Sequence, residues 1–375
     1  MRIGLIAEFN PLHTGHKYLI SEAKKIIAEN GVGELVCVMS EFFTQRGEVA
    51  IIDGYSRARE AIYSGCDLVI ALPYRVSVAF SDDFAHKSIE ILVNCKITHL
   101  IFGTEEDIEK FEYMYNLENS SETTIKIKEY LKLGYSYPKI MSKIFEINSV
   151  NSNFILAYSY YKAIKKLAPN IKLIPVKRRG QNLNQTNLDD SEFLSATSIR
   201  KNYANELIKN YISENMYNNI FNKANMNEEK FYNLLKYKIL SLGKENLKNI
   251  YDVTEGLENR IYQAALISNN YDELVALIST KRYTNKRIKR ILSYVLTNSS
   301  RNEMLEDIKD LRILAVNKNK TYLIKEINKL EKVKLHQKLN KNNEKYFKHD
   351  IRVARIYNIF YNENDIFKYN IEIVE

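Results

Sequence analysis

The first half of this chain is constrained most by a series of short, nearly continuous apolar runs. Runs of this kind, without polar alternation, are typical of strands buried on both faces of a sheet. Stretches with apolar residues at helical spacing separate them, and this alternation predicts right-handed crossovers and a parallel sheet. We therefore predict an α/β fold with a Rossmann-like five-stranded parallel sheet over residues 1–200. The expected strands are Arg2–Ala7, Glu34–Met39, Asp67–Pro73, Thr98–Gly103 and Ile171–Lys177.

The pattern changes after Ser195. Between Ser198 and Leu339 no run reads as a strand, and apolar residues such as Leu234, Leu235 and Ile239 recur at helical spacing. A chain of 375 residues is also longer than one core usually organises. We therefore expect a second, mostly α-helical domain over residues 201–375. Its end, 351–359 and 370–374, fits either short strands or a packing helix.

Composition excludes several classes of protein. The hydrophobic fraction is 45% and no apolar run reaches the roughly 18 residues of a membrane span, which argues against a disordered chain and a membrane partner. The 3 cysteines, Cys37, Cys66 and Cys95, are odd in number and widely spaced, which excludes a disulfide scaffold and a cysteine zinc site. We expect buried free thiols and a cytoplasmic protein, and nothing implies a protein partner.

Positive charge is concentrated late in the chain. The whole chain carries a net charge of +9, whereas residues 281–350 alone contain 19 Lys and Arg against 8 Asp and Glu. On a helix, Arg282, Lys286 and Lys289 would share a face suited to a phosphate backbone. A solvated helix surface is the alternative. The predicted nucleic-acid contacts are Lys281, Arg282, Lys286, Arg287, Lys289 and Arg290.

A histidine pair follows the first predicted strand. His13 and His16 flank Gly15 at the expected start of a helix. Unpaired N–H groups at a helix start favour phosphate, and glycine lets the backbone approach a ligand closely. Two imidazoles three residues apart can both donate to phosphate oxygens where charge develops in a transition state. We therefore predict His13 and His16 as catalytic residues.

A second phosphate element is expected at Ser195–Arg200. Its hydroxyl residues would cap a helix, and Arg200 would reach a phosphate oxygen. Two helix starts could then hold one triphosphate between them.

His13-Thr14-Gly15-His16 resembles the HxGH signature of adenylyl-transferring nucleotidyltransferases, and Ser195–Arg200 resembles their second phosphate motif. A larger set of motifs, in the right order over most of residues 1–300, resembles the tRNA(Met) cytidine acetate ligase family. The motifs are Glu8-Phe9-Asn10-Pro11, Met39-Ser40, Gln45-Arg46-Gly47-Glu48, residues 67–73, Lys177-Arg178, residues 195–200 and Lys281-Arg282-Tyr283-Thr284.

The resemblance implies an enzyme that activates acetate with ATP, with Mg²⁺ bridging phosphates. It implies transfer of the acetyl group to N4 of the wobble cytidine of elongator tRNA(Met), and it places no metal ligand on the chain. The implied ATP-binding residues are Ala7, Glu8, Phe9, Asn10, Pro11, Leu12, His13, Thr14, Gly15, His16, Lys17, Tyr18, Leu19, Ile20, Gly103, Asn153, Arg178, Thr197, Ser198 and Arg200.

This chain departs from the family pattern in the loop after the second strand. Glu41 follows Met-Ser where the family has Gly, and Val49 follows Arg-Gly-Glu where it has Pro. Two other functions stay open: an adenylyltransferase acting on a small phosphorylated cofactor, and a non-catalytic RNA-binding protein with a degenerate nucleotide site.

Overall fold

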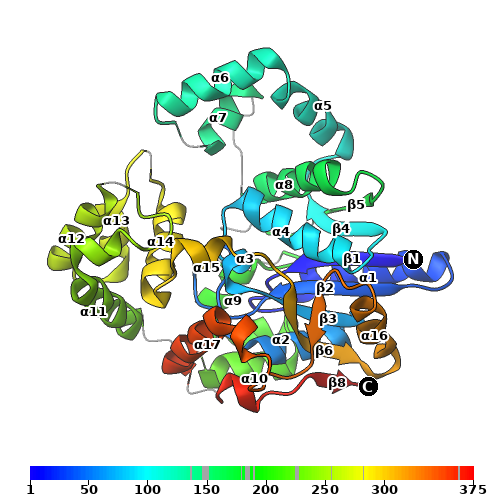
Figure 1. The fold of residues 1–375 in the computed structure, drawn as a ribbon. Coiled ribbons are helices and arrows are strands. Elements are labelled where there is room, and N and C mark those ends of the chain that lie inside the picture. Colours follow the sequence, from blue (N-terminus) through cyan, green and yellow to red (C-terminus); the bar gives the residue numbers. More distant parts are fainter. Residues whose placement is uncertain are drawn as a thin grey trace.

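The computed structural model describes residues 1–135, 137–145, 152–178, 180–181, 186–188, 191–223, 228–254, 256–281, 283–361 and 364–375. The predicted contact Arg282 lies outside these ranges. Figure 1 shows a twisted sheet with helices on both faces and a group of helices, α11 to α14, beside it.

The sheet has eight strands in the order β5-β4-β1-β2-β3-β6-β7, with β8 paired to β6. The pairs β5–β4, β4–β1, β1–β2 and β2–β3 are all parallel. This confirms the predicted α/β fold and its five parallel strands. The strands are β1 (Arg2–Ala7), β2 (Glu34–Ser40), β3 (Leu68–Leu72), β4 (His99–Thr104), β5 (Lys172–Lys177), β6 (Asp310–Asn317), β7 (Lys334–His336) and β8 (Glu372–Val374).

Helices make up most of the remaining structure. They are α1 (Thr14–Glu29), α2 (Gly54–Tyr63), α3 (Tyr74–Ser77), α4 (Ser81–Asn94), α5 (Ile108–Glu118), α6 (Ser121–Lys132), α7 (Tyr137–Ile144), α8 (Ser152–Leu167), α9 (Ala196–Lys201), α10 (Glu214–Lys223), α11 (Glu228–Leu247), α12 (Leu257–Ile267), α13 (Tyr271–Ile278), α14 (Asn285–Thr297), α15 (Arg301–Leu305), α16 (Tyr322–Asn328) and α17 (Lys348–Tyr361).

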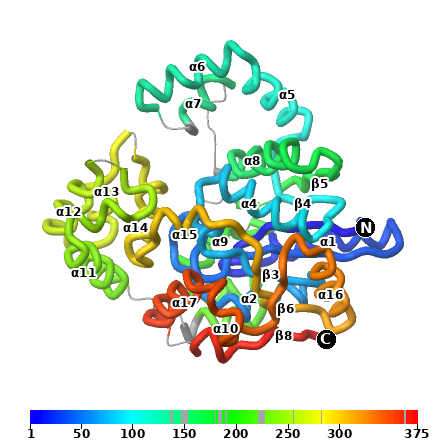
Figure 2. The backbone as a smooth tube through the Cα atoms, viewed as in Figure 1, coloured from blue at the N-terminus to red at the C-terminus, as the bar shows by residue number. Residues whose placement is uncertain are grey.

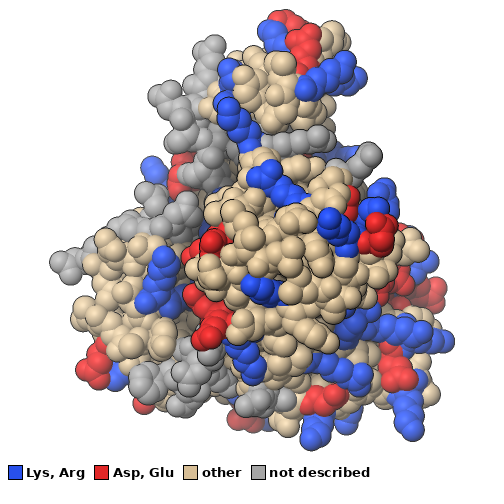
Figure 3. Space-filling view, turned by 90° about the vertical axis from the view of Figure 1, so that its left-hand side faces the viewer, with Lys and Arg blue, Asp and Glu red and all other residues tan. Residues whose placement is uncertain are grey.

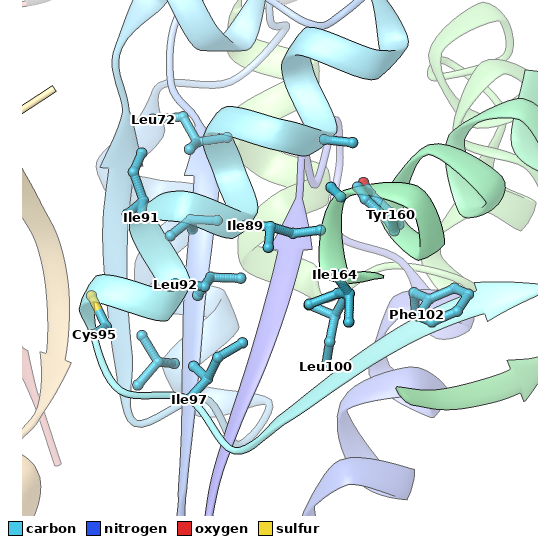
Figure 4. Close-up of a cluster of buried hydrophobic side chains, with 14 of the residues drawn as sticks. Leu72, Ile89, Ile91, Leu92, Cys95, Ile97, Leu100, Phe102, Tyr160 and Ile164 are labelled. Carbon is cyan, nitrogen blue, oxygen red and sulfur yellow. The ribbon is translucent and has the colours of Figure 1, made fainter. Parts of the chain in front are cut away.

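Each face of the sheet has its own core, because successive side chains of a strand point to opposite faces. On one face, Leu100 of β4 packs with Ile89 of α4 and Ile164 of α8, as Figure 4 shows. On the other, Leu5 of β1 packs with residues of α1 and α2, such as Ala23 and Ala58. The strands therefore lie in the middle of three layers, with the carboxyl ends of β1 and β4 free to carry a site.

The expectation of no strand between Ser198 and Leu339 is wrong. β6 lies in this range, pairs antiparallel with β3 and extends the sheet, and β7 lies there too. Figure 2 traces the return of the chain, in orange and red, beside its first strands. The C-terminal residues, for which the sequence left strands and a helix as alternatives, form helix α17 and strand β8.

Helices α11 to α14 form a separate core that rests on the loop between β2 and α2. Ile291 of α14 and Leu235 of α11 lie in this core together with Phe43, Val49 and Tyr74. The hydroxyl of Tyr74 donates to Ser293 Oγ at 3.1 Å. The helical part is therefore attached directly to the loops that follow the carboxyl ends of β2 and β3.

Two features of the sequence have simple structural outcomes. Cys37, Cys66 and Cys95 are buried free thiols, as expected. Glu41, the departure from the family pattern, is buried and forms an ion pair with Arg312 of β6. The loop after β2 is thereby tied to the late strand that completes the sheet.

Candidate active site

The histidine pair lies at the switch point of the sheet. β1 is flanked by β2 on one side and by β4 on the other. The connection from β1 to β2 and the connection from β3 to β4 therefore lead to opposite sides of β1. Ligands of open α/β sheets bind in the crevice at such a point, outside the carboxyl ends of the strands. The turn from Glu8 to His13 leads from β1 into α1 there.

His13 and His16 form a reciprocal cap at the start of α1. The Gly15 N–H donates to Nδ1 of His13 at 3.1 Å, and the His13 N–H donates to Nδ1 of His16 at 3.4 Å. The ring centroids lie 3.9 Å apart, and the ring of Phe9 meets His16 edge-on at 5.1 Å. Because Nδ1 of each ring accepts a hydrogen bond, a neutral ring carries its proton on Nε2.

Both imidazoles are held in the neutral form. Burial, then His16 and the cations of Arg178 and Arg200, lowers the pKa of His13 well below its usual value. Burial and the charge of Arg178 lower the pKa of His16 to about 3. The pair thus presents two Nε2–H donors without carrying charge itself, and both rings line the cavity described below.

The start of α1 differs from the expectation in one respect. The Thr14 N–H donates to the Tyr211 carbonyl at 2.7 Å, and the Gly15 N–H is used by His13. The first N–H groups of the helix are therefore already paired, and the donors left for a phosphate are the imidazoles. Gly15 is needed for a related reason: a Cβ there would lie 3.0 Å from Cε1 of His13.

Arg200 links α9 to the histidine turn. Its guanidinium donates to the Asn10 carbonyl at 2.7 Å and to Thr197 Oγ1 at 3.3 Å. Asn10 Oδ1 in turn accepts from the Ile51 N–H at 2.9 Å. The Nδ2 donor of Asn10 is buried with no partner in the described chain, and Asn10 lines the cavity. Burial lowers the pKa of Arg200, and the carboxylates of Glu48 and Glu8 oppose this effect.

Arg178 follows β5 and lies against Gly103 at the end of β4. A Cβ on Gly103 would lie 3.3 Å from Cγ of Arg178, so the glycine leaves room for the aliphatic part of this side chain. Within the described ranges the guanidinium makes no hydrogen bond, and burial lowers the pKa of Arg178. The carboxylate of Glu105 opposes this effect on the pKa of Arg178. A guanidinium with unused donors beside a neutral histidine pair suits a phosphate ligand.

One cavity of about 930 Å³ joins these residues. Of the predicted ATP contacts it is lined by Ala7, Glu8, Phe9, Asn10, His13, Gly15, His16, Tyr18, Leu19, Gly103, Asn153, Arg178 and Arg200.

Seven predicted contacts lie outside the lining, namely Pro11, Leu12, Thr14, Lys17, Ile20, Thr197 and Ser198. Leu12 and Ile20 are core residues. Lys17 pairs with Glu60 at 3.2 Å, and Ser198 donates to the Asn187 carbonyl at 2.9 Å.

Sequence reasoning assigned no role to several lining residues, among them Gln45, Arg46, Tyr160 and Phe193. Gln45 and Arg46 belong to the motif of residues 45–48, so a signal for them was present. Burial raises the pKa of Glu8, whose carboxylate accepts the Gln45 N–H at 2.6 Å. Tyr160 and Phe193 reach the cavity only through tertiary packing, for which the sequence offers no local pattern.

The predicted cationic face of α14 is largely engaged within the protein. Arg287 forms two hydrogen bonds to Asp252, at 3.0 and 2.6 Å, and Lys289 pairs with Glu48 at 3.4 Å. Lys281 and Lys286 are exposed, while Arg290 is buried. Lys286, Arg287 and Arg290 line the same cavity as the histidines. On the face seen in Figure 3, basic side chains are dispersed among acidic and uncharged ones.

Neither a metal centre nor a membrane span is found among the described residues. They contain no group of three or more His, Cys, Asp or Glu that could hold a metal ion. They also contain no helix that is both long and apolar enough to span a membrane.

A parallel sheet with a histidine pair at its switch point and a second basic element at α9 defines an HxGH-type nucleotidyltransferase. The family model for HIGH nucleotidyl transferases matches residues 1–370. The tRNA(Met) cytidine acetate ligase of Staphylococcus aureus strain JH9 is 32% identical over 361 residues, covering 95% of this chain and 94% of the relative. The chain belongs to the tRNA(Met) cytidine acetate ligase family and is an enzyme.

Solved structures have the same fold. The apo form of Thermotoga maritima TmcAL matches with a TM-score of 0.86 at 23% identity, covering 100% of both chains. The form of that protein bound with alpha-thio ATP matches with a TM-score of 0.83 at 22% identity, again over 100% of both chains.

Proposed function

We propose that this enzyme activates acetate with ATP and transfers the acetyl group to N4 of the wobble cytidine of elongator tRNA(Met). The observation that carries the proposal is the neutral His13–His16 pair, which presents two Nε2–H donors to a cavity shared with Arg178 and Arg200. The name of the relatives, tRNA(Met) cytidine acetate ligase, supports a cytidine of tRNA(Met) as the acceptor and acetate as the acid. The reaction belongs in the cytoplasm, where tRNA is available.

In the first step, an acetate oxygen attacks the α-phosphorus of ATP. A new P–O bond forms, the bond from the α-phosphorus to the bridging oxygen breaks, and pyrophosphate leaves with the electron pair. Negative charge grows on the phosphate oxygens in the transition state. Donors fixed before the reaction stabilise such charge most effectively. The hydrogen bonds that Nδ1 of His13 and Nδ1 of His16 accept fix both imidazoles in this way.

In the second step, the N4 amine of cytidine attacks the acetyl carbonyl of acetyl-adenylate. A C–N bond forms, the anhydride C–O bond breaks, and AMP leaves with one proton of the amine released. No covalent enzyme intermediate is required, and the three cysteines are buried free thiols.

Mg²⁺ is expected with the triphosphate, where it neutralises phosphate charge. Because the described residues offer no ligand cluster for it, the phosphates and water would hold the ion. The steps above therefore rest on the chain's own residues.

The two substrates are assigned to different parts of the chain. We propose that residues 1–200 bind ATP and that residues 201–375 contribute to tRNA binding through the cations around α14. Helices α11 to α14 reach the cavity through Lys286, Arg287 and Arg290, so both substrates would meet in one space.

Acetate-dependent exchange of labelled pyrophosphate into ATP tests the first step, with formate and propionate as comparison acids. Mass spectrometry of nucleosides from tRNA incubated with ATP and acetate tests the second, and acetyl-CoA without ATP should yield no product. Exchange without acetylated tRNA would point to a small-molecule adenylyltransferase. Absence of exchange with every acid, but retained RNA binding, would point to a degenerate nucleotide site.

A further inference from the structure

We infer that the cavity contains a second compartment, built from Phe80, Asp83 and Arg290, that binds a single cytosine nucleotide of RNA. The inference rests on the proposed function and adds to it the site of the acceptor base. An enzyme that modifies a base takes that base out of its stack and holds it in a pocket, by stacking and by hydrogen bonds to its edge.

Phe80 and Arg290 form a stacking surface. Phe80 directly precedes α4, lines the cavity and keeps 37% of its surface exposed. The guanidinium of Arg290, from α14, lies 5.9 Å from the centroid of the Phe80 ring. Proteins that bind unpaired nucleotides stack the bases on aromatic rings and on arginine planes. Here both kinds of surface meet at one place.

Arg290 also forms no direct ion pair. Only 8% of its surface is exposed, yet its guanidinium makes no hydrogen bond or ion pair with the described residues. Its neighbour Arg287, one helical turn earlier, is fully paired with Asp252. Burial lowers the pKa of Arg290, and the carboxylates of Asp252 and Asp83 oppose this effect only in part. Its unused N–H donors therefore favour a ligand that brings negative charge and accepts hydrogen bonds. A phosphate beside the bound base does both.

Asp83 supplies selectivity for cytosine. It lies three residues after Phe80, in the first turn of α4, and lines the cavity without a hydrogen bond or ion pair to any described residue. A carboxylate accepts a hydrogen bond from the N4 amine of cytosine, the atom that receives the acetyl group. Uracil presents an oxygen at this position, which a carboxylate repels.

Arg46 connects this compartment to the histidine pair. Burial raises the pKa of Glu8, and the cation of Arg46 opposes this effect. Burial lowers the pKa of Lys286, and Arg46 and Arg290 lower it further. Arg46 is thus close to groups of both compartments. A volume of about 930 Å³ is near the upper end for ligand pockets, which suits two ligands.

The test measures binding of two anticodon stem–loop RNAs, with cytidine or uridine at the wobble position. Wild type should prefer cytidine by about tenfold or more. Phe80→Leu should weaken binding of both RNAs by about ten- to a hundredfold. Arg290→Gln should weaken both and flatten the log–log salt slope by about one. Asp83→Asn, whose amide can donate to uridine O4, should bring the preference close to one.

Matched controls lie outside the cavity lining. Tyr237→Leu removes an aromatic ring that is 71% exposed on α11, and Asp272→Asn changes an exposed carboxylate in the first turn of α13. Both should bind the two RNAs as wild type does. Thermal unfolding of every variant shows that the loss is not one of folding.

The phosphate near Arg290 could belong to RNA or to ATP, and a second measurement separates them. If Arg290→Gln raises KM for ATP in acetate-dependent exchange and leaves RNA binding intact, Arg290 belongs to the triphosphate and the inference is overturned. An unchanged cytidine preference in Asp83→Asn also overturns it. RNA binding can be measured without any reaction, so the binding results test this inference even if wild type fails to activate acetate. That failure would contradict the proposed function but not the RNA-binding compartment.

Discussion

Gly103 and Arg178 pack against each other across neighbouring strand ends, with 3.3 Å between Cγ of the arginine and the position of a Cβ on residue 103. This spacing is tighter than ordinary van der Waals contact, so a side chain at residue 103 displaces the arginine. The backbone N–H of Arg178 donates to the Thr104 carbonyl at 3.0 Å, but its guanidinium makes no hydrogen bond within the described chain, so the position of the side chain depends on packing against residue 103.

Gly103→Ala should therefore raise KM for ATP in acetate-dependent pyrophosphate exchange by about tenfold, the effect of weakening one charged hydrogen bond by about 1.4 kcal/mol. A double-mutant cycle with Arg178→Ala checks the cause. If Gly103→Ala has the same effect whether or not Arg178 is present, the glycine does not act through the arginine.

Replacing His16 with Ala should reduce acetyl-adenylate formation by about 10²–10³-fold, the usual loss for one transition-state donor. The measurement is acetate-dependent pyrophosphate exchange at saturating ATP. His86→Ala, on α4 and outside the cavity lining, is the control. Exchange close to that of wild type in His16→Ala would exclude the assigned role.

The buried histidines should also make stability fall in mild acid. Burial holds the pKa of His16 at about 3 and that of His13 well below its usual value, whereas both titrate near 6.5 in the unfolded chain. The unfolded chain therefore binds protons first as the pH falls below about 6.5. Each histidine should cost about 2 kcal/mol of unfolding free energy at pH 5.

Urea unfolding between pH 7.5 and 5 measures this effect. A His13→Asn/His16→Asn variant should lose less stability over the same range than wild type does. Equal pH dependence of the two proteins would mean that the histidines are accessible to protons in the folded state.

Among the residues of the basic segment around α14 that the structure describes, Lys281 and Lys286 are the exposed cations, since Arg287 and Lys289 are paired. Changing both to Ala should lower tRNA affinity and flatten the log–log salt slope by about one for each phosphate that is no longer neutralised. Filter binding across salt concentrations measures the slope. Lys325→Ala/Lys329→Ala, at α16, is the matched control. An unchanged slope in the Lys281/Lys286 variant would mean that these lysines are only solvated and contact no phosphate.

The Glu41–Arg312 pair should be important for stability, because both side chains are buried. Glu41→Gln leaves a buried cation without its partner and should cost about 3–5 kcal/mol of unfolding free energy. Replacing both residues, as Glu41→Leu/Arg312→Met, should cost less than either single change. Chemical denaturation tests this order, and a double variant less stable than both single variants would contradict it.

Local patterns in the sequence predicted what local contacts determine. The five parallel strands are marked by uninterrupted apolar runs, and the His13–His16 cap depends on residues three positions apart. Strand β6 was missed because Arg312 interrupts its apolar run, and the arginine is explained only by distant partners, Tyr55 and Glu41, the latter 271 residues away in the chain. The pairing of Arg287 and Lys289 was missed for the same reason, since Asp252 and Glu48 come from other segments.

The antiparallel pairing of β6 with β3 also sets an order of events during synthesis. A ribosome adds about 5–20 residues per second, so roughly ten to fifty seconds separate the appearance of β3 from that of β6. During this interval β3 is paired with β2 on one side only, and its other edge is a template on which nascent chains can associate. The sheet that carries the active site is thus completed only late in translation, and the open edge of β3 has to be kept from other chains until β6 covers it.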